Sequence, residues 1–150
     1  MSTLERLTAD LTTSLKARDT LRTSTLRQLI GAVRNEAKAG TVERELTEDE
    51  VLAVLARESK KRRESAQIYT DAGAADRAAT ETAEADVVDE YLPTRLTDDE
   101  LAALVDAVLA DTGASSMKDM GAVMKEATAR AQGRADGRAL STLVRARLAG

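Results

Sequence analysis

The sequence predicts an all-α protein with a four-helix N-terminal portion followed by a three-helix C-terminal module. Aromatic residues make up only 1% of the chain, and its abundance of Ala, Leu, Glu and Arg favours helix over strand. Apolar residues recur at steps of three and four along most of the chain, which is the spacing of amphipathic helices. Pro93 is the only proline in 150 residues, so this pattern has one strong interruption.

A helix must end at Tyr91-Leu92-Pro93. Proline lacks the backbone N–H that a helix interior needs, and it pushes Leu92 towards extended dihedral angles. After it, Thr97 and Glu100 have the spacing of a capping box that begins a new helix. We therefore expect two domains, a helical N-terminal domain over residues 1–92 and a three-helix domain over residues 93–150.

Four helices are expected in the first domain. The second should begin near Asp19 and end at Gly40, where glycine can adopt a left-handed cap. Thr47 and Glu50 form a capping box for the third, which ends at Gly73. The fourth covers 76–91, and its acidic C-terminal end opposes the helix dipole, which suggests that a basic segment lies nearby. The apolar stripes of the first two helices are Leu4, Leu7, Leu11 and Leu15, then Leu26, Leu29, Ile30 and Val33.

The third helix carries the sequence RESKKRRESA at 57–66, in which residues 57–65 include no apolar side chain. One interpretation is a solvated helix stabilised by pairs at i,i+4 spacing, such as Glu58 with Arg62, each contributing ~0.2–0.5 kcal/mol. The other is a patch that binds phosphates or an acidic protein partner. The residues of that patch would be Arg57, Lys60, Lys61, Arg62 and Arg63.

Three helices are expected after Pro93, separated by glycines. Gly113 ends the first of them and Gly133 the second, while Ser116 with Asp119, and then Asp136, supply caps for the helices that follow. The expected buried residues are Leu101, Leu104, Val105 and Val108 in the first, Met117, Met120, Met124 and Ala127 in the second, and Leu140, Leu143, Val144 and Leu148 in the third.

Composition restricts the chemistry open to this chain. It contains no Cys and no His, so disulfides, thiolate ligands and imidazole proton transfer are excluded. The acidic runs at 48–50 and 98–100 occupy first turns, where the helix dipole favours carboxylates, so we predict no metal site. Ser116 beside Lys118 is explained as a helix cap, and we predict no catalytic residue and no cofactor. The N-terminus lacks a signal peptide and no apolar run spans a membrane, which predicts a cytoplasmic protein.

Positive charge gathers at the carboxyl end of a chain whose formal net charge is −4. Lys118 with Lys125, and Arg138 with Arg145, stand at i,i+7 spacing, so each pair shares a helix face. The joint between these helices contains Gly133, Arg134 and Gly137, where a phosphate backbone could approach closely. The alternative is a glycine joint between helices with ordinary solvated arginines.

Six segments, taken in order, resemble the YqeY family nearly from end to end. They are STLRQLIGAV (24–33), RESKKRRESA (57–66), AGAADRA (72–78), EYLP (90–93), KDMGAVMK (118–125) and GRADGR (133–138). The stretch from Met117 to Leu148 is also similar to the tail domain of the B subunit of the tRNA-dependent Asp/Glu amidotransferase, the GatB/YqeY domain.

The resemblance implies a C-terminal GatB/YqeY module that contacts tRNA through phosphate and shape, with little base reading. The implied RNA-binding residues are Lys118, Gly121, Lys125, Gly133, Arg134, Gly137, Arg138 and Arg145. It leads to a non-catalytic tRNA-binding accessory module linked to tRNA-dependent amidotransferase or glutaminyl-tRNA synthetase systems. The alternatives are a helical adaptor that uses residues 57–66 to bind a synthetase or amidotransferase subunit, and a carbon–nitrogen ligase with glutamine as amide donor.

Overall fold

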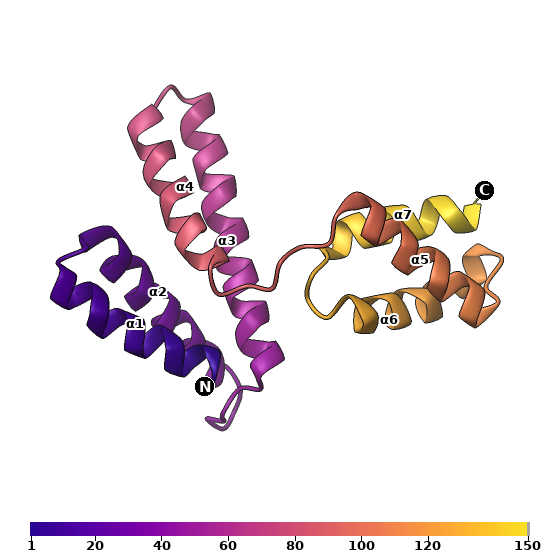
Figure 1. The fold of residues 1–150 in the computed structure, drawn as a ribbon, viewed down its shortest axis with the longest axis horizontal. Helices are drawn as coiled ribbons and strands as arrows, with labels where there is room; N and C mark the ends of the chain where they lie inside the picture. The colour runs from indigo at the N-terminus through magenta and orange to yellow at the C-terminus, as the bar shows by residue number, and fades with distance from the viewer. Residues whose placement is uncertain (150) are drawn as a thin grey trace. The chain divides into compact units, whose positions relative to one another are not determined.

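The structure is a computed structural model, and it describes residues 1–149. Within these residues it contains seven α-helices and a single 3-10 turn, and no strand, which confirms the all-α fold (Figure 1). Contacts along the chain divide it into two compact units, Met1–Leu92 and the chain from Pro93 onward. The helices are α1 (Thr3–Ala17), α2 (Thr20–Ala37), α3 (Glu48–Asp71), α4 (Ala75–Asp89), α5 (Asp98–Thr112), α6 (Met120–Ala131) and α7 (Gly137–Ala149).

Unit 1, Met1–Leu92, consists of two antiparallel helix pairs, α1 with α2 and α3 with α4 (Figure 1). Most of the two predicted apolar stripes points inward, and Leu7, Leu26 and Leu29 are completely buried. The prediction was wrong for Leu15, which is 46% exposed because no neighbouring helix covers the end of α1. Capping boxes begin α1 at Ser2 and α3 at Thr47, where each hydroxyl accepts a backbone N–H from the residue three positions on. The predicted end of α3 is also correct, since Gly73 follows it with φ 78°.

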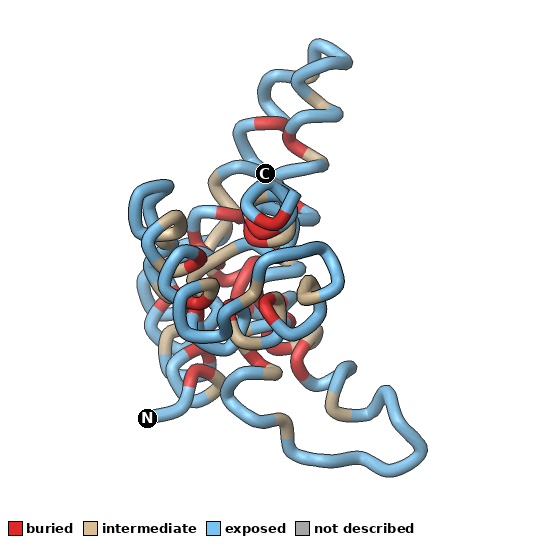
Figure 2. Tube along the Cα trace, turned by 90° about the vertical axis from the view of Figure 1, so that its right-hand side faces the viewer, coloured by how far each residue is buried: buried red, intermediate tan, exposed pale blue. Residues whose placement is uncertain are grey.

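The core of unit 1 does not reach the far end of the α3–α4 hairpin. Figure 2 shows buried residues along the lower part of this hairpin and exposed residues at its tip. Only the small side chains of Ala66 and Ala78 are buried towards that end, while Ile68 is exposed. Short alanine side chains let the two helices approach closely, but they bury little apolar area for stabilisation.

The prediction for the end of α2 was wrong. The helix stops at Ala37 with Lys38 as its cap, and Lys38 has φ −101° in place of a left-handed angle. Gly40 lies in the following loop and is not among the glycines with positive φ. The amides of Lys38 and Ala39 donate to the carbonyls of Asn35 and Glu36, so a tightened last turn replaces the glycine cap.

Unit 2 is a three-helix bundle with its own core. The buried residues Val105, Val108, Leu140 and Val144 pack together from α5 and α7. The capping box at Thr97 begins α5, and Gly113 ends it with φ 67°, both as predicted. The loops that lead into and out of α6 are short, so α6 runs antiparallel to α5 and α7 (Figure 1).

The start of the sixth helix differs from the prediction. Met117–Asp119 form a 3-10 turn, and α6 begins only at Met120. The change of helical phase leaves the Met117 side chain exposed and places Val123 in the centre of the core. The carboxylate of Asp119 accepts the backbone N–H groups of Ser115 and Ser116, at 3.0 and 3.4 Å, and so stabilises the turn.

Within residues 1–149, no helix combines the length and the apolar character that crossing a lipid bilayer would require.

Candidate nucleic-acid interface

The four cations that were paired by i,i+7 spacing are all exposed on unit 2. Lys118 lies in the 3-10 turn, Lys125 on α6, and Arg138 and Arg145 on α7. None of the four forms an ion pair with a carboxylate of the described residues. Their charges therefore remain available to an external anion.

The other arginines of α6 and α7 are paired with acids. Arg130 binds Asp111 of α5 at 2.8 Å and Glu126 at 2.9 Å. Hydrogen bonds to Glu126 and then to Asp111 raise the pKa of Arg130. On α7, Arg147 binds Asp106 of α5 at 2.9 Å. These pairs mark the sides of α6 and α7 that face α5.

Helix geometry separates the free cations from the paired ones. At ~100° per residue, Lys125 stands roughly 140° around α6 from Arg130, and Arg145 stands roughly 160° around α7 from Arg147. Since Arg130 and Arg147 face α5, Lys125 and Arg145 lie on the sides of their helices away from α5. We use the name α6–α7 flank for Lys125, Arg145, the glycine Gly121 one turn before Lys125, and the exposed Lys118 of the 3-10 turn that precedes α6.

Arg138 occupies a different place from the α6–α7 flank. It borders an apolar groove of about 560 Å³ between α5 and α7, together with the carboxylates of Asp98 and Asp136. These acids lower the positive potential around its guanidinium. Arg138 and Arg145 both lie on α7 at the predicted i,i+7 spacing. Their environments differ, because only Arg138 has Asp98 of α5 and Asp136 of the preceding joint beside it.

Arg134 is engaged in holding the joint between α6 and α7. Its Nε donates to the carbonyl of Thr94 at 2.7 Å, and its guanidinium lies 3.6 Å from Glu100. Its own carbonyl accepts the N–H of Leu96 at 2.8 Å. Arg134, which was predicted to face RNA phosphates, thus connects the segment after Pro93 to the joint between α6 and α7.

The glycines of the predicted site serve two different purposes. Gly133 has φ 76° and follows Gln132, which is also left-handed at φ 49°, so the turn itself explains Gly133. Gly121 and Gly137 lie in helices, and a Cβ atom added at either would meet nothing within 4 Å. Glycine inside a helix destabilises it by roughly 0.5–1 kcal/mol relative to alanine. Gly137 is the first residue of α7, so this cost does not apply to it, whereas packing within unit 2 does not account for Gly121.

The prediction that Lys118 and Lys125 share one helix face rested on a wrong assumption. It assumed one continuous helix, whereas Lys118 belongs to the 3-10 turn before α6. The sequence signal for that turn was the Ser-Ser-Met-Lys-Asp run, which offers two amides to one carboxylate.

Four of the five cations at 57–66 form ion pairs with acids of unit 1, including the Glu58–Arg62 pair of the solvated-helix interpretation. Binding of a partner by this stretch stays a prediction. Arg57 pairs with Glu36 of α2 at 3.3 Å, and Lys61 with Glu58 at 3.0 Å. Arg63 bridges Asp86 and Asp89 of α4 at 2.9 and 2.5 Å, and its hydrogen bonds to Asp89 and then Asp86 raise its pKa. The prediction that the acidic end of the fourth helix lies beside a basic segment is confirmed.

Arg62 departs furthest from the predicted patch, because its side chain is only 3% exposed. Its guanidinium donates to Glu58 at 2.6 Å and to the side-chain carbonyl of Gln28 at 2.6 Å, and its Nε lies 3.4 Å from Glu84. It therefore connects α2, α3 and α4. Among the five predicted partner-binding residues, Lys60 alone has no ion pair with a described carboxylate.

Within residues 1–149 no group of three or more Asp and Glu side chains is arranged to hold a metal ion. The hollows of unit 1 lie elsewhere than the basic stretch, and one of them is lined by Arg18 and Arg27, which the sequence reasoning did not single out. The signal that could have revealed it is the run of Thr20, Ser24 and Arg27 at steps of four and three with no acid among them.

The chain was compared with known proteins in two ways. A search of the curated proteins found no match. The model of the family described as Yqey-like protein matches residues 4–148, which is nearly the whole chain and includes both units. With its two helical units and this match, the chain belongs to the YqeY-like family.

Proposed function

We propose that this protein is a non-catalytic tRNA-binding accessory module linked to tRNA-dependent amidotransferase or glutaminyl-tRNA synthetase systems. The observation that carries the proposal is the α6–α7 flank, where the exposed cations Lys118, Lys125 and Arg145 are free of ion pairs with described acids. The binding partner would be the sugar–phosphate backbone, because the flank offers cations and no aromatic ring for base stacking.

Gly121 supports the proposal from a separate direction. It lies one helical turn before Lys125, with open space where a side chain would stand. A helix with a glycine at such a position exposes its backbone, and a ribose–phosphate chain can approach it more closely than it could approach a side chain. Binding of RNA would then explain why α6 carries a glycine that lowers its stability.

The absence of Cys and His from the whole chain favours binding over catalysis. These two residues supply most of the nucleophiles and proton carriers that act near neutral pH. The adaptor hypothesis based on residues 57–66 has less support, because four of its five cations are paired within unit 1.

The proposal is tested by titrating bulk tRNA into the protein at several salt concentrations. The double variant Lys125→Gln with Arg145→Gln removes two cations of the α6–α7 flank. Each cation that neutralises a phosphate contributes about 0.7–0.9 to the slope of log Kobs against log salt concentration, so the slope should fall by roughly 1.5.

The matched control is Arg130→Gln with Arg147→Gln. It removes the same charge from the same two helices, but on the sides that face α5. Its salt slope should equal that of the unmodified chain. Equal slopes for both double variants would show that net charge alone governs the interaction, and the α6–α7 flank would then be excluded as the tRNA site.

A further inference from the structure

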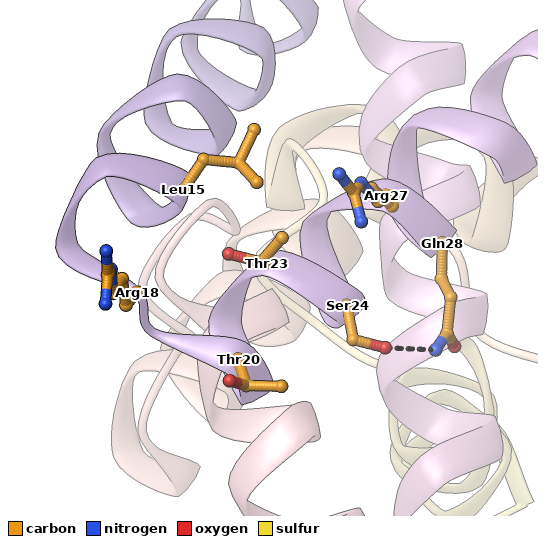
Figure 3. Close-up of a pocket in the computed structure, with 7 residues that line it drawn as sticks. All are labelled: Leu15, Arg18, Thr20, Thr23, Ser24, Arg27 and Gln28. Atoms are coloured by element: carbon orange, nitrogen blue, oxygen red, sulfur yellow. Dashed lines mark hydrogen bonds between the residues drawn. The ribbon is translucent and has the colours of Figure 1, made fainter.

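The α1–α2 hairpin of unit 1 carries an open hollow of about 380 Å³. It lies where α1 ends and α2 begins, and Figure 3 shows Arg18 and Arg27 on opposite sides of Leu15 and Thr23. It combines two arginines that form no ion pair with described acids, an exposed leucine, and walls joined by hydrogen bonds. Its lining residues are Leu15, Arg18, Thr20, Thr23, Ser24, Arg27 and Gln28.

The charge of the hollow is positive and uncompensated. Neither Arg18 nor Arg27 forms an ion pair with a carboxylate of the described residues, and no acid lines the hollow. Several other arginines of unit 1 are paired, among them Arg22 with Glu90 and Arg44 with Glu50, each at 2.5 Å. An anionic group placed between Arg18 and Arg27 would meet two guanidinium groups. The neighbouring acid, Asp19, does not line the hollow, and its carboxylate accepts the N–H of Arg22 at the start of α2.

Leu15 gives the hollow an apolar surface. It continues the stripe of Leu7 and Leu11 along α1, yet its side chain is 46% exposed while Leu7 is fully buried. No residue of the described chain covers it further. Removing an exposed leucine side chain from water stabilises a complex, so Leu15 is suited to contact an apolar group of a partner.

The walls of the hollow are held in place by hydrogen bonds. Thr23 donates to Ser14 at 2.9 Å and joins α2 to α1. Gln28 donates to Ser24 at 3.3 Å and accepts from the buried Arg62 at 2.6 Å. A surface that is already ordered loses less side-chain entropy when it binds a partner.

We propose that this hollow is a docking site for an acidic amphipathic helix of a protein partner. The apolar side chains of such a helix would cover Leu15, and its carboxylates would pair with Arg18 and Arg27, as in other helix-in-groove complexes. An RNA backbone fits less well, because its phosphates and riboses are polar and gain nothing from the exposed apolar side chain of Leu15. This site is separate from the α6–α7 flank and does not depend on tRNA binding.

The test uses the full chain labelled with ¹⁵N and a synthetic helical peptide of about five turns. The peptide carries leucines at i, i+3 and i+7 with glutamates beside them, and a matched peptide has every Glu replaced by Gln. Amide chemical shifts report where each peptide binds. We expect the acidic peptide to perturb the amides of residues 15–28 and the glutamine peptide to leave them unchanged.

Two sets of variants then separate the contributions of charge and apolar contact. Arg18→Glu with Arg27→Glu should weaken binding of the acidic peptide roughly tenfold or more, and Leu15→Gln should weaken it measurably. The charge-matched control, Lys16→Glu with Lys60→Glu, changes two exposed lysines outside the hollow and should leave the affinity unchanged. All these positions are exposed, so circular dichroism should show unchanged helix content.

Four results would each overturn the proposal. They are the absence of any shift at millimolar acidic peptide, equal binding of the two peptides, unchanged affinity after Leu15→Gln, and stronger perturbation of the same amides by bulk tRNA than by the peptide. The last result would assign the hollow to RNA. None of these outcomes bears on the salt slope of the α6–α7 flank, so the two proposals can fail independently.

Discussion

Arg62 is a long, charged residue that is almost completely buried, and its bonding explains why it belongs to the fold. Its guanidinium donates to Glu58 and to Gln28, and its Nε lies near Glu84. Burial raises the pKa of Glu58, but the hydrogen bonds from Lys61 and Arg62 outweigh it, so the pKa is lowered overall. The Glu58 carboxylate is thus stabilised in its charged form by the two cations that donate to it.

The variant Arg62→Ala should lower the free energy of unfolding by roughly 2–4 kcal/mol. Removing one member of a buried ion pair leaves the other charge without compensation. Here Glu84 would lose its described ion pair, while Glu58 would retain only Lys61. Urea denaturation measures the change. Lys60→Ala in the same helix is the control and should cost less than about 0.5 kcal/mol. Similar losses for both variants would mean that Arg62 does not hold α2, α3 and α4 together.

Tyr91 is a second buried residue whose polar atom is fully used. Its hydroxyl donates to Asp10 and accepts from Arg22, and Arg6 lies over its ring at 4.9 Å from the centroid. Burial and then the hydrogen bond to Asp10 raise the pKa of Tyr91 to about 12, from an ordinary value of 10. The neutral phenol is therefore favoured in the folded chain.

The stability of unit 1 should fall as the pH rises from about 10 to about 12. The folded state retains the Tyr91 proton in this range while the unfolded state releases it, so deprotonation stabilises the unfolded state relative to the folded one. Urea denaturation at a series of pH values measures the slope. In Tyr91→Phe this component of the slope should disappear. An identical slope in that variant would assign the alkaline loss to other groups.

Among the helices, those whose ends are set by local bonds were predicted well. The capping boxes at Thr47 and Thr97 and the left-handed glycines at 73 and 113 depend only on residues within one turn. The start of α6 was predicted less well, because the 3-10 turn at 117–119 changes which residue reaches the core. Which residue of α6 reaches the core depends on how Val123 packs against α5 and α7. The sequence of α6 alone does not contain that information.

Gly121 gives an element-level test of binding against folding. Gly121→Ala should raise the free energy of unfolding by roughly 0.5–1 kcal/mol, because alanine is the better helix former and meets no neighbour there. The same variant should bind tRNA more weakly, since the methyl group would keep the phosphate backbone away. Thermal denaturation and a tRNA titration measure the two effects.

Gly31 in α2 provides the control for that experiment. It also lies in a helix with nothing within 4 Å of an added Cβ atom, so Gly31→Ala should stabilise the chain without changing tRNA affinity. If Gly121→Ala stabilises the protein and binds tRNA as tightly as the unmodified chain, the glycine has no role in binding.

In the whole molecule, each unit has a core of its own. The core of unit 1 includes Leu7, Leu26 and Val88, and that of unit 2 includes Val105, Val123 and Val144. A self-contained core is the main requirement for independent folding, although a chain of this size has little stability to spare.

A fragment of residues 93–150 should therefore fold by itself. We expect helical circular dichroism and a cooperative thermal transition, with binding of tRNA that has the salt slope of the full chain. The variant Val123→Asp in this fragment, which buries a charge in its core, is the control and should abolish the transition. A fragment without a cooperative transition would show that unit 2 depends on unit 1.

The sequence by itself determined the all-α class, the number of helices and most of their ends. Hydrophobic period, caps and a single proline are local signals, and they act within a few residues of the position they govern. It also placed Lys125 and Arg145 on outward helix faces, since a helix fixes the angles between its own residues.

Only the tertiary structure decided which charges are free. Arg62, Arg63 and Arg134 have their acidic and carbonyl partners 20 or more positions away in the chain, at Glu84, Asp89 and Thr94. Positive residues are clustered in both parts of the sequence. Those at 57–66 mostly form ion pairs within unit 1, whereas Lys125 and Arg145 form none with the described acids. The strength of a charge at a surface depends on the distance to its nearest opposite charge, and folding sets that distance.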